Sequence, residues 1–299
     1  MQKSTIFFAG LSLLLAALTG GVLARLWAAP AGFEGGAVDT SLDIGLPVGG
    51  SKWASDIVQA RSTLLWNVAA GVIEKEHNGF ARQPIASLTK IMTAMVLLDF
   101  GIDWEQQVTI EPHEYVIGGR LLLHPGETAT MRDLWHASLM GSANNATLAM
   151  VRGAGVPETE FVQAMNRKAI ALGLEQTEFS DVTGLDTDNV STAYEMARLL
   201  EAGLRDYPAI AEATSRVDYE FIVGGSGRQH LLRNTNQLAT EAHWSIRGGK
   251  TGYLYEAGYC LITQGGEGGN FIAVVLGAES EEASVQQVQD LLQSGYGGV

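Results

Sequence analysis

The spacing of apolar and polar positions predicts strands near both ends of the folded part of the chain and helices between them. Residues 62–76 have the composition of two short strands around a turn. Residues 258–264 and 270–278 flank a glycine-rich turn and form a predicted hairpin. Between these segments, apolar residues recur at helical spacing. The predicted helices cover 88–101, 131–141, 157–173, 196–203 and 284–295. The helix over 196–203 is preceded by Thr192 and Glu195, which have the spacing of a capping box.

This order of strands, helices, strands and a helix is typical of the α+β class. The late hairpin pairs most simply with the first strands in one antiparallel sheet. Helices cover that sheet, and the central helices form an adjoining all-helical lobe. We expect a functional site in the cleft between the sheet and the lobe.

The first 30 residues have the pattern of an export segment. Residues 6–24 are apolar and uncharged, Lys3 precedes them, and small residues follow. The run fits either a cleaved signal peptide or an uncleaved N-terminal membrane anchor. Residues 31–50 are glycine-rich and predict a flexible linker, so the folded domain is expected over 51–299. Either interpretation sends the domain out of the cytoplasm, so we expect it beyond the membrane or on its outer face.

Composition narrows the classes of function. The 299 residues carry 19 Lys+Arg and 33 Asp+Glu, a formal charge of −14, and 46% are hydrophobic. The chain is therefore expected to fold and not to bind nucleic acid, which requires a basic surface. Its one cysteine, Cys260, excludes an intramolecular disulfide and is expected to be packed, not reactive. The six histidines form no metal-binding motif, so we expect neither a metal nor a cofactor.

A first candidate motif is Ser-x-x-Lys, at Ser87 and Lys90. Positions three apart share one face of a helix. A serine hydroxyl is a weak nucleophile that needs a base within reach, and a lysine can serve if burial lowers its pKa. Taken alone, the pair is equally typical of a helix-capping serine followed by a surface lysine.

Two further motifs follow. Ser142 and Asn144 lie in a predicted turn between helices, where they could relay a proton and hold an amide, although loop capping explains such a pair as well. Lys250, Thr251 and Gly252 lie on a predicted strand. The first two supply a cation and a hydroxyl for an anionic group, and the glycine permits a close approach by a ligand.

The three motifs in this order resemble those of the penicillin-binding protein and β-lactamase superfamily. The chain is most similar to the serine-type D-alanyl-D-alanine carboxypeptidases, which are the low-molecular-mass penicillin-binding proteins. The similarity extends over about residues 54–295 and includes 123–127, 134–145, 161–166, 172–174, 183–185, 191–193, 234–236 and 257–259. It implies a β-lactamase/transpeptidase-like fold.

The resemblance also implies roles for the motif residues. Ser87 corresponds to the nucleophile that becomes acylated, and Lys90 to its general base. Ser142 corresponds to the group that passes a proton to the leaving D-alanine, and Asn144 to the one that positions Lys90 and the substrate.

Substrate binding is implied for a second set of residues. Lys250, Thr251 and Gly252 would bind the substrate, with Thr251 on its carboxylate. Arg233 lies near the place where the family has an arginine for that carboxylate. The backbone N–H groups of Ser87 and Tyr253 would form the oxyanion hole.

The implied substrate is a peptidoglycan stem peptide that ends in D-Ala-D-Ala, and β-lactam antibiotics are expected to be covalent inhibitors. Three alternatives remain: a D,D-endopeptidase that cuts crosslinks, a β-lactamase, and a non-catalytic wall-binding module. A β-lactamase usually has a Glu-x-x-Leu-Asn pattern, which is missing around Glu175 and Glu178. The chain ends soon after its last predicted helix, so we expect membrane contact only through the N-terminal segment.

Overall fold

The computed structural model describes residues 60–116, 118–119 and 123–296. The predicted export segment (1–30) and linker (31–50) lie outside these residues. In the part of the chain that is described, no helix combines the length and the apolar composition needed to cross a membrane.

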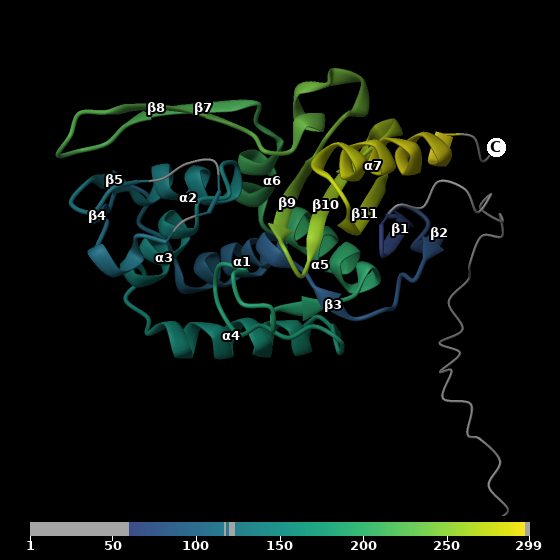
Figure 1. Cartoon of the computed structure of the whole chain (residues 1–299), viewed down its shortest axis with the longest axis horizontal. Coiled ribbons are helices and arrows are strands. Elements are labelled where there is room, and N and C mark those ends of the chain that lie inside the picture. The colour runs from purple at the N-terminus through teal and green to yellow at the C-terminus, as the bar shows by residue number, and fades with distance from the viewer. Residues whose placement is uncertain (1–59, 117, 120–122, 297–299) are drawn as a thin grey trace, which may run out of the picture. The chain divides into compact units, whose positions relative to one another are not determined.

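A five-stranded antiparallel sheet lies at the centre of the fold, in the order β2-β1-β11-β10-β9 (Figure 1). Ser62 of β1 pairs with Leu276 of β11, which confirms that the late hairpin joins the first strands. The order leaves β9, the strand of the Lys-Thr-Gly motif, at one edge of the sheet. The strands of this sheet are β1 (Ser62–Asn67), β2 (Val72–His77), β9 (Gly248–Leu254), β10 (Gly258–Gly265) and β11 (Phe271–Ala278).

Helices cover both faces of the sheet. Helix α7 (Glu281–Tyr296) packs on one face, where its Val288 and Leu292 join a core with Leu65. Helix α5 (Ala193–Asp206) packs on the other face, in the core that contains Leu64. Because both faces are covered, the central strands are apolar on both sides, and every residue of β11 is buried.

The remaining helices form the helical part beside the sheet, as predicted (Figure 1). They are α1 (Lys90–Phe100), α2 (Met131–Leu139), α3 (Asn144–Gly153), α4 (Glu158–Ala171) and α6 (Pro208–Ser215). Six short strands form three two-stranded ladders. They are β3 (Gln83–Pro84) with β6 (Val190–Ser191), β4 (Gln107–Thr109) with β5 (Thr128–Thr130), and β7 (Asp218–Ile222) with β8 (Gln229–Arg233).

Several local features differ from the sequence-based expectation. The prediction lacked α3, α6 and the β7–β8 hairpin. The Thr192 side chain caps α5 by accepting a hydrogen bond from the Glu195 N–H at 3.1 Å. The Glu195 carboxylate does not complete the capping box, because it accepts hydrogen bonds from the Gln176 N–H and the Thr177 hydroxyl. The predicted burial of Cys260 is confirmed, since its residue is 2% exposed.

Asn234 ties α6 to the segment that leads into β9. Its buried side-chain Nδ2 donates to the carbonyl oxygens of Thr214 and Arg216 at 2.9 and 2.8 Å. Its Oδ1 accepts from the Asn236 N–H at 2.9 Å. One side chain therefore satisfies three backbone groups in this connection.

We predict that Asn234→Ala lowers the free energy of unfolding by about 3 kcal/mol, because backbone groups near it lose their hydrogen-bond partner. Urea unfolding followed by circular dichroism measures this change. Gln286→Ala, at an exposed position of α7, is the matched control and should change stability by less than about 0.5 kcal/mol. Equal stability of the two variants would contradict the prediction.

Candidate active site

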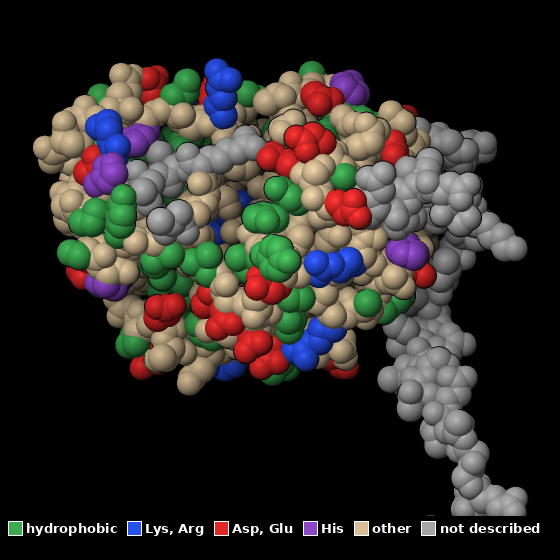
Figure 2. Space-filling view, viewed as in Figure 1, with side chains coloured by type: hydrophobic (Ala, Val, Ile, Leu, Met, Phe, Trp, Pro, Cys, Tyr) green, Lys and Arg blue, Asp and Glu red, His purple; other side chains and the backbone are tan. Residues whose placement is uncertain are grey.

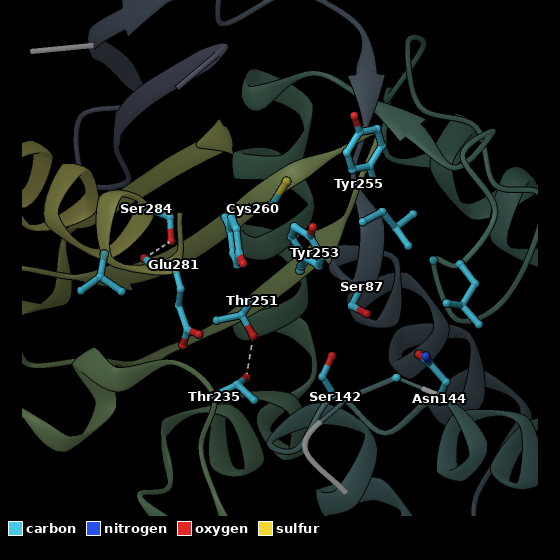
Figure 3. A pocket seen from close by; sticks show the side chains of 18 residues that line it. Ser87, Ser142, Asn144, Thr235, Thr251, Tyr253, Tyr255, Cys260, Glu281 and Ser284 are labelled. Carbon is cyan, nitrogen blue, oxygen red and sulfur yellow. Dashed lines mark hydrogen bonds between the residues drawn. The ribbon is translucent and has the colours of Figure 1, made fainter. Parts of the chain in front are cut away.

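All three sequence motifs meet at one cavity, which has a volume of about 360 Å³. Ser87, Ser142, Asn144 and Thr251 line it, together with Tyr253 at the end of β9. Figure 2 shows a recess in this face of the molecule with basic side chains at its floor. In Figure 3, Ser87 lies between Tyr253 on one side and Ser142 and Asn144 on the other.

Ser87 and Lys90 lie at the junction of a 3₁₀ turn, η1 (Ala86–Thr89), and helix α1. Lys90 Nζ donates to Ser87 Oγ at 2.9 Å, so the spacing of three places the two groups together as predicted. Its other acceptors are Asn144 Oδ1 at 2.7 Å and the Thr183 carbonyl oxygen at 2.6 Å. All three acceptors are neutral, and Lys90 is only 1% exposed.

Burial changes the acidity of Lys90. Loss of solvent around the ammonium lowers the pKa of Lys90 from its ordinary value of 10.5 to about 7, and the negative charge of Asp181 opposes part of this decrease. A large fraction of Lys90 is therefore neutral at neutral pH. A neutral amine 2.9 Å from a hydroxyl can accept its proton.

Asp181 is a residue that the sequence analysis missed. Its carboxylate accepts hydrogen bonds from the N–H groups of Thr183, Gly184 and Asp186 at 2.7, 2.5 and 2.7 Å. These bonds fix the loop that presents the Thr183 carbonyl to Lys90. The only signal in the sequence was an aspartate two residues before the noted segment 183–185, a spacing typical of an Asx turn.

Ser142 and Lys250 form a second hydrogen-bonded pair. Lys250 is 1% exposed, and its Nζ donates to Ser142 Oγ and to the Thr251 carbonyl, both at 2.9 Å. Ser142 occupies the turn between α2 and α3 with a left-handed φ of 56°. A non-glycine residue in that conformation is strained, which indicates that the surrounding contacts fix its position.

Thr251 and Gly252 continue the motif along β9. Thr251 Oγ1 donates to Thr235 Oγ1 at 2.6 Å, so two hydroxyls lie side by side in the cavity wall (Figure 3). Thr235 belongs to the segment 234–236, for which the sequence analysis named no role. A Cβ at Gly252 would lie 3.0 Å from the backbone nitrogen of Ser87. Glycine thus allows β9 to pack directly against η1 and brings the backbone of Tyr253 close to that of Ser87.

Comparison with protein families matches residues 51–280 to peptidase S11, described as D-alanyl-D-alanine carboxypeptidase. The chain belongs to the D-alanyl-D-alanine carboxypeptidase family. It is 34% identical over 245 residues to D-alanyl-D-alanine carboxypeptidase DacF of Bacillus subtilis, covering 80% of this chain and 62% of that protein. It is also 34% identical over 203 residues to a D-alanyl-D-alanine endopeptidase of Pseudomonas aeruginosa, covering 67% of this chain and 65% of that protein. The chain thus spans somewhat less than two thirds of these relatives.

Solved structures agree with this family and with the predicted fold. The Streptomyces K15 DD-transpeptidase is similar with a TM-score of 0.74 at 25% identity, over 80% of this chain and 97% of that one. A D-alanyl-D-alanine carboxypeptidase DacD from Francisella tularensis, at 23% identity, has the same fold with a TM-score of 0.72, over 80% of this chain and 71% of that one. The β-lactamase/transpeptidase-like α+β architecture is therefore confirmed.

One residue expected at the site lies elsewhere. In this family member, Arg233 is exposed at the end of β8, opposite Asp218, and is not among the described residues that line the cavity. The neighbouring hydroxyls of Thr235 and Thr251 are at the cavity instead. Within the described residues, no group of three His, Cys, Asp or Glu side chains is arranged to hold a metal ion.

We predict that Asp181→Asn lowers the pKa of Lys90 below its value of about 7, because the variant removes the negative charge that opposes the effect of burial. Nitrogen-detected NMR titration of lysine-labelled protein measures this pKa directly. Asp188→Asn, an exposed position in the same segment, is the control and should leave it unchanged. An unchanged or raised pKa of Lys90 in Asp181→Asn would show that the charge of Asp181 does not raise the pKa of Lys90.

Proposed function

We propose that this chain is a serine-type D-alanyl-D-alanine carboxypeptidase that removes the terminal D-alanine from peptidoglycan stem peptides through an acyl-enzyme on Ser87. The observation that carries the proposal is the contact of 2.9 Å between Ser87 Oγ and a buried lysine whose pKa is about 7. A serine needs such a base to become nucleophilic at neutral pH. Family membership supplies the substrate class.

Acylation begins with neutral Lys90. Its Nζ takes the proton of Ser87 Oγ while that oxygen attacks the carbonyl carbon of the penultimate D-alanine. Negative charge develops on the carbonyl oxygen, and the N–H groups of Ser87 and Tyr253 stabilise it. The close packing at Gly252 supports this pairing, since it brings the two backbones together.

The leaving group then needs a proton. Ser142, whose hydroxyl accepts a hydrogen bond from Lys250, donates a proton to the nitrogen of the departing D-alanine. The bond between the carbonyl carbon and this nitrogen breaks, and the ester on Ser87 remains. The proton that Lys90 accepted replaces the one lost by Ser142, and Asn144 supports this relay by holding Lys90 through its Oδ1.

The carboxylate of the terminal D-alanine binds to Lys250, Thr251 and Thr235. Lys250, which donates to Ser142 Oγ in the cavity wall, provides the cation, and the two hydroxyls donate hydrogen bonds. Deacylation follows the same route with water: Lys90 takes a proton from a water molecule while the water oxygen attacks the ester carbon. The bond from that carbon to Ser87 Oγ then breaks, Ser87 Oγ receives the proton from Lys90, and the shortened peptide leaves with a new terminal carboxyl group. A β-lactam ring would acylate Ser87 in the same way and inhibit the enzyme.

The substrate also implies a location. Peptidoglycan lies outside the cytoplasm, so we propose that the protein is exported to the cell envelope by the segment 1–30, either as a signal peptide or as an anchor. Membrane contact would then be confined to that segment.

The D,D-endopeptidase is the second candidate, because a relative with that name is as similar in sequence as the carboxypeptidase relative. It would use the same groups on a crosslinked peptide. The structure does not favour a β-lactamase. Glu175 and Glu178 are both exposed, Glu178 pairs with Arg82 at 2.6 Å, and neither is among the described residues that line the cavity.

We predict that kcat/KM for D-alanine release falls about tenfold per pH unit below pH 7, since protonated Lys90 cannot accept the serine proton. Above pH 7 the rate should reach a plateau. Enzymatic detection of D-alanine released from a pentapeptide measures this profile on the full chain.

Ser87→Ala should abolish both the release of D-alanine and labelling by a fluorescent penicillin, whereas the exposed control Ser180→Ala should retain both. Release that survives in Ser87→Ala would refute the acyl-enzyme.

Crosslinked muropeptide dimers separate the two candidate activities. For a carboxypeptidase we expect faster release of D-alanine from pentapeptide monomers than cleavage of dimers, measured by chromatography of the products. Cleavage of dimers without release from monomers would establish the endopeptidase instead.

A further inference from the structure

A second hollow of about 490 Å³ adjoins the active-site cavity at Tyr253. Three side chains, those of Tyr253, Tyr255 and Tyr259, line both. We call the second hollow the tyrosine groove. Its lining consists of Ala60, Arg61, Tyr253, Tyr255, Gly258, Tyr259, Gly277, Ala278 and Glu279. It therefore adjoins the catalytic cavity along the β9–β10 hairpin.

Arg61 is held in place at this groove. Its aliphatic stem lies against Gly277, where an added Cβ would come within 2.8 Å of the arginine carbons. Its Nη1 donates to the carbonyl oxygen of Glu256 at 2.6 Å. Within the described residues this is the one hydrogen bond of its side chain, and a guanidinium carries five N–H donors.

A charge of opposite sign lines the same groove. Glu279 is exposed just after β11, and its carboxylate forms no ion pair or hydrogen bond with another described residue. Arg61 and Glu279 thus line one hollow without pairing with each other. A ligand group that carries both an ammonium and a carboxylate would complement the two side chains together.

The direction of the substrate follows from β9. This strand is at the edge of the sheet, where an extended peptide can add by backbone hydrogen bonds. With its terminal carboxylate at Lys250 and Thr251 and its scissile carbonyl at Ser87, an antiparallel peptide extends upstream toward Tyr253 and Tyr255. One residue advances the chain by about 3.3 Å, so the residue before D-Ala-D-Ala lies at the entrance of the tyrosine groove.

We propose that the tyrosine groove is a specificity subsite for the residue that precedes D-Ala-D-Ala. It selects a long side chain that ends in an ammonium and a carboxylate, which Glu279 and Arg61 bind respectively. This inference rests on the proposed function, because it assigns the upstream part of the same substrate. It makes the groove the place where this enzyme distinguishes one stem peptide from another.

The tyrosines suit the aliphatic part of such a side chain. The rings of Tyr253 and Tyr259 lie 4.3 Å apart and form one wall. Tyr255 is 86% exposed, although it lines both hollows. A chain of methylene groups that passes over these rings would bury apolar surface on the way to the two charged groups.

The test compares three peptides that differ only in the residue before D-Ala-D-Ala: a zwitterionic side chain, lysine, and glutamate. We expect the highest kcat/KM for the zwitterionic peptide. Arg61→Gln should lower kcat/KM about fivefold for the zwitterionic and glutamate peptides and leave the lysine peptide unchanged, as expected for one exposed charge pair. Glu279→Gln should lower kcat/KM about fivefold for the zwitterionic and lysine peptides and leave kcat/KM for the glutamate peptide unchanged.

Two control variants isolate the effect. Arg247 is another exposed arginine held by a backbone carbonyl, at 2.8 Å from Gly268 O, and Glu282 is an exposed glutamate at the start of α7. Arg247→Gln and Glu282→Gln should leave kcat/KM unchanged for all three peptides. Equal kcat/KM for the three peptides, or equal losses in the groove and control variants, would overturn the subsite while the carboxypeptidase stands. Absence of D-alanine release from every peptide would overturn the proposed function as well.

Discussion

Two lysines buried behind the wall of one cavity impose the constraint on which this site depends. Lys90 and Lys250 are each 1% exposed, so both have lost most of their water and need protein acceptors. The acceptors come from segments far apart in the sequence, including Ser142, Asn144 and Thr183. Helix α3, the loop around Thr183 and strand β9 must therefore be in place together. The neutral acceptors around Lys90 leave burial to dominate its pKa.

Much of the fold and site could be predicted from the sequence because the decisive signals are local. Ser87 and Lys90 meet through helical spacing, and the hairpin around a glycine turn pairs with the first strands. The missed elements had weaker signals: α6 is short, and β7 and β8 are five-residue strands with one fully buried residue each. The role of Asp181 depends on a contact between residues 90 and 183, which no local pattern encodes.

The whole-chain charge of −14 and the cationic site are compatible because they act over different distances. Exposed carboxylates are screened within about 8 Å at physiological ionic strength. Lys250 is buried beside the cavity, and its Nζ donates to the Ser142 hydroxyl in the cavity wall, next to the place proposed for the substrate carboxylate. A sequence-level charge therefore limits the classes of macromolecular partner but does not decide what a cavity binds.

The position of β9 at the edge of the sheet also affects how the protein must avoid self-association. An open edge is a template for pairing with another chain, and many proteins cover it or place charges along it. Here the proposed substrate needs that edge, so a permanent cover would block catalysis. The packing of η1 against Gly252 narrows access to the strand. A peptide bound there would complete the sheet as a temporary sixth strand, so occupancy would protect the folded protein from aggregation.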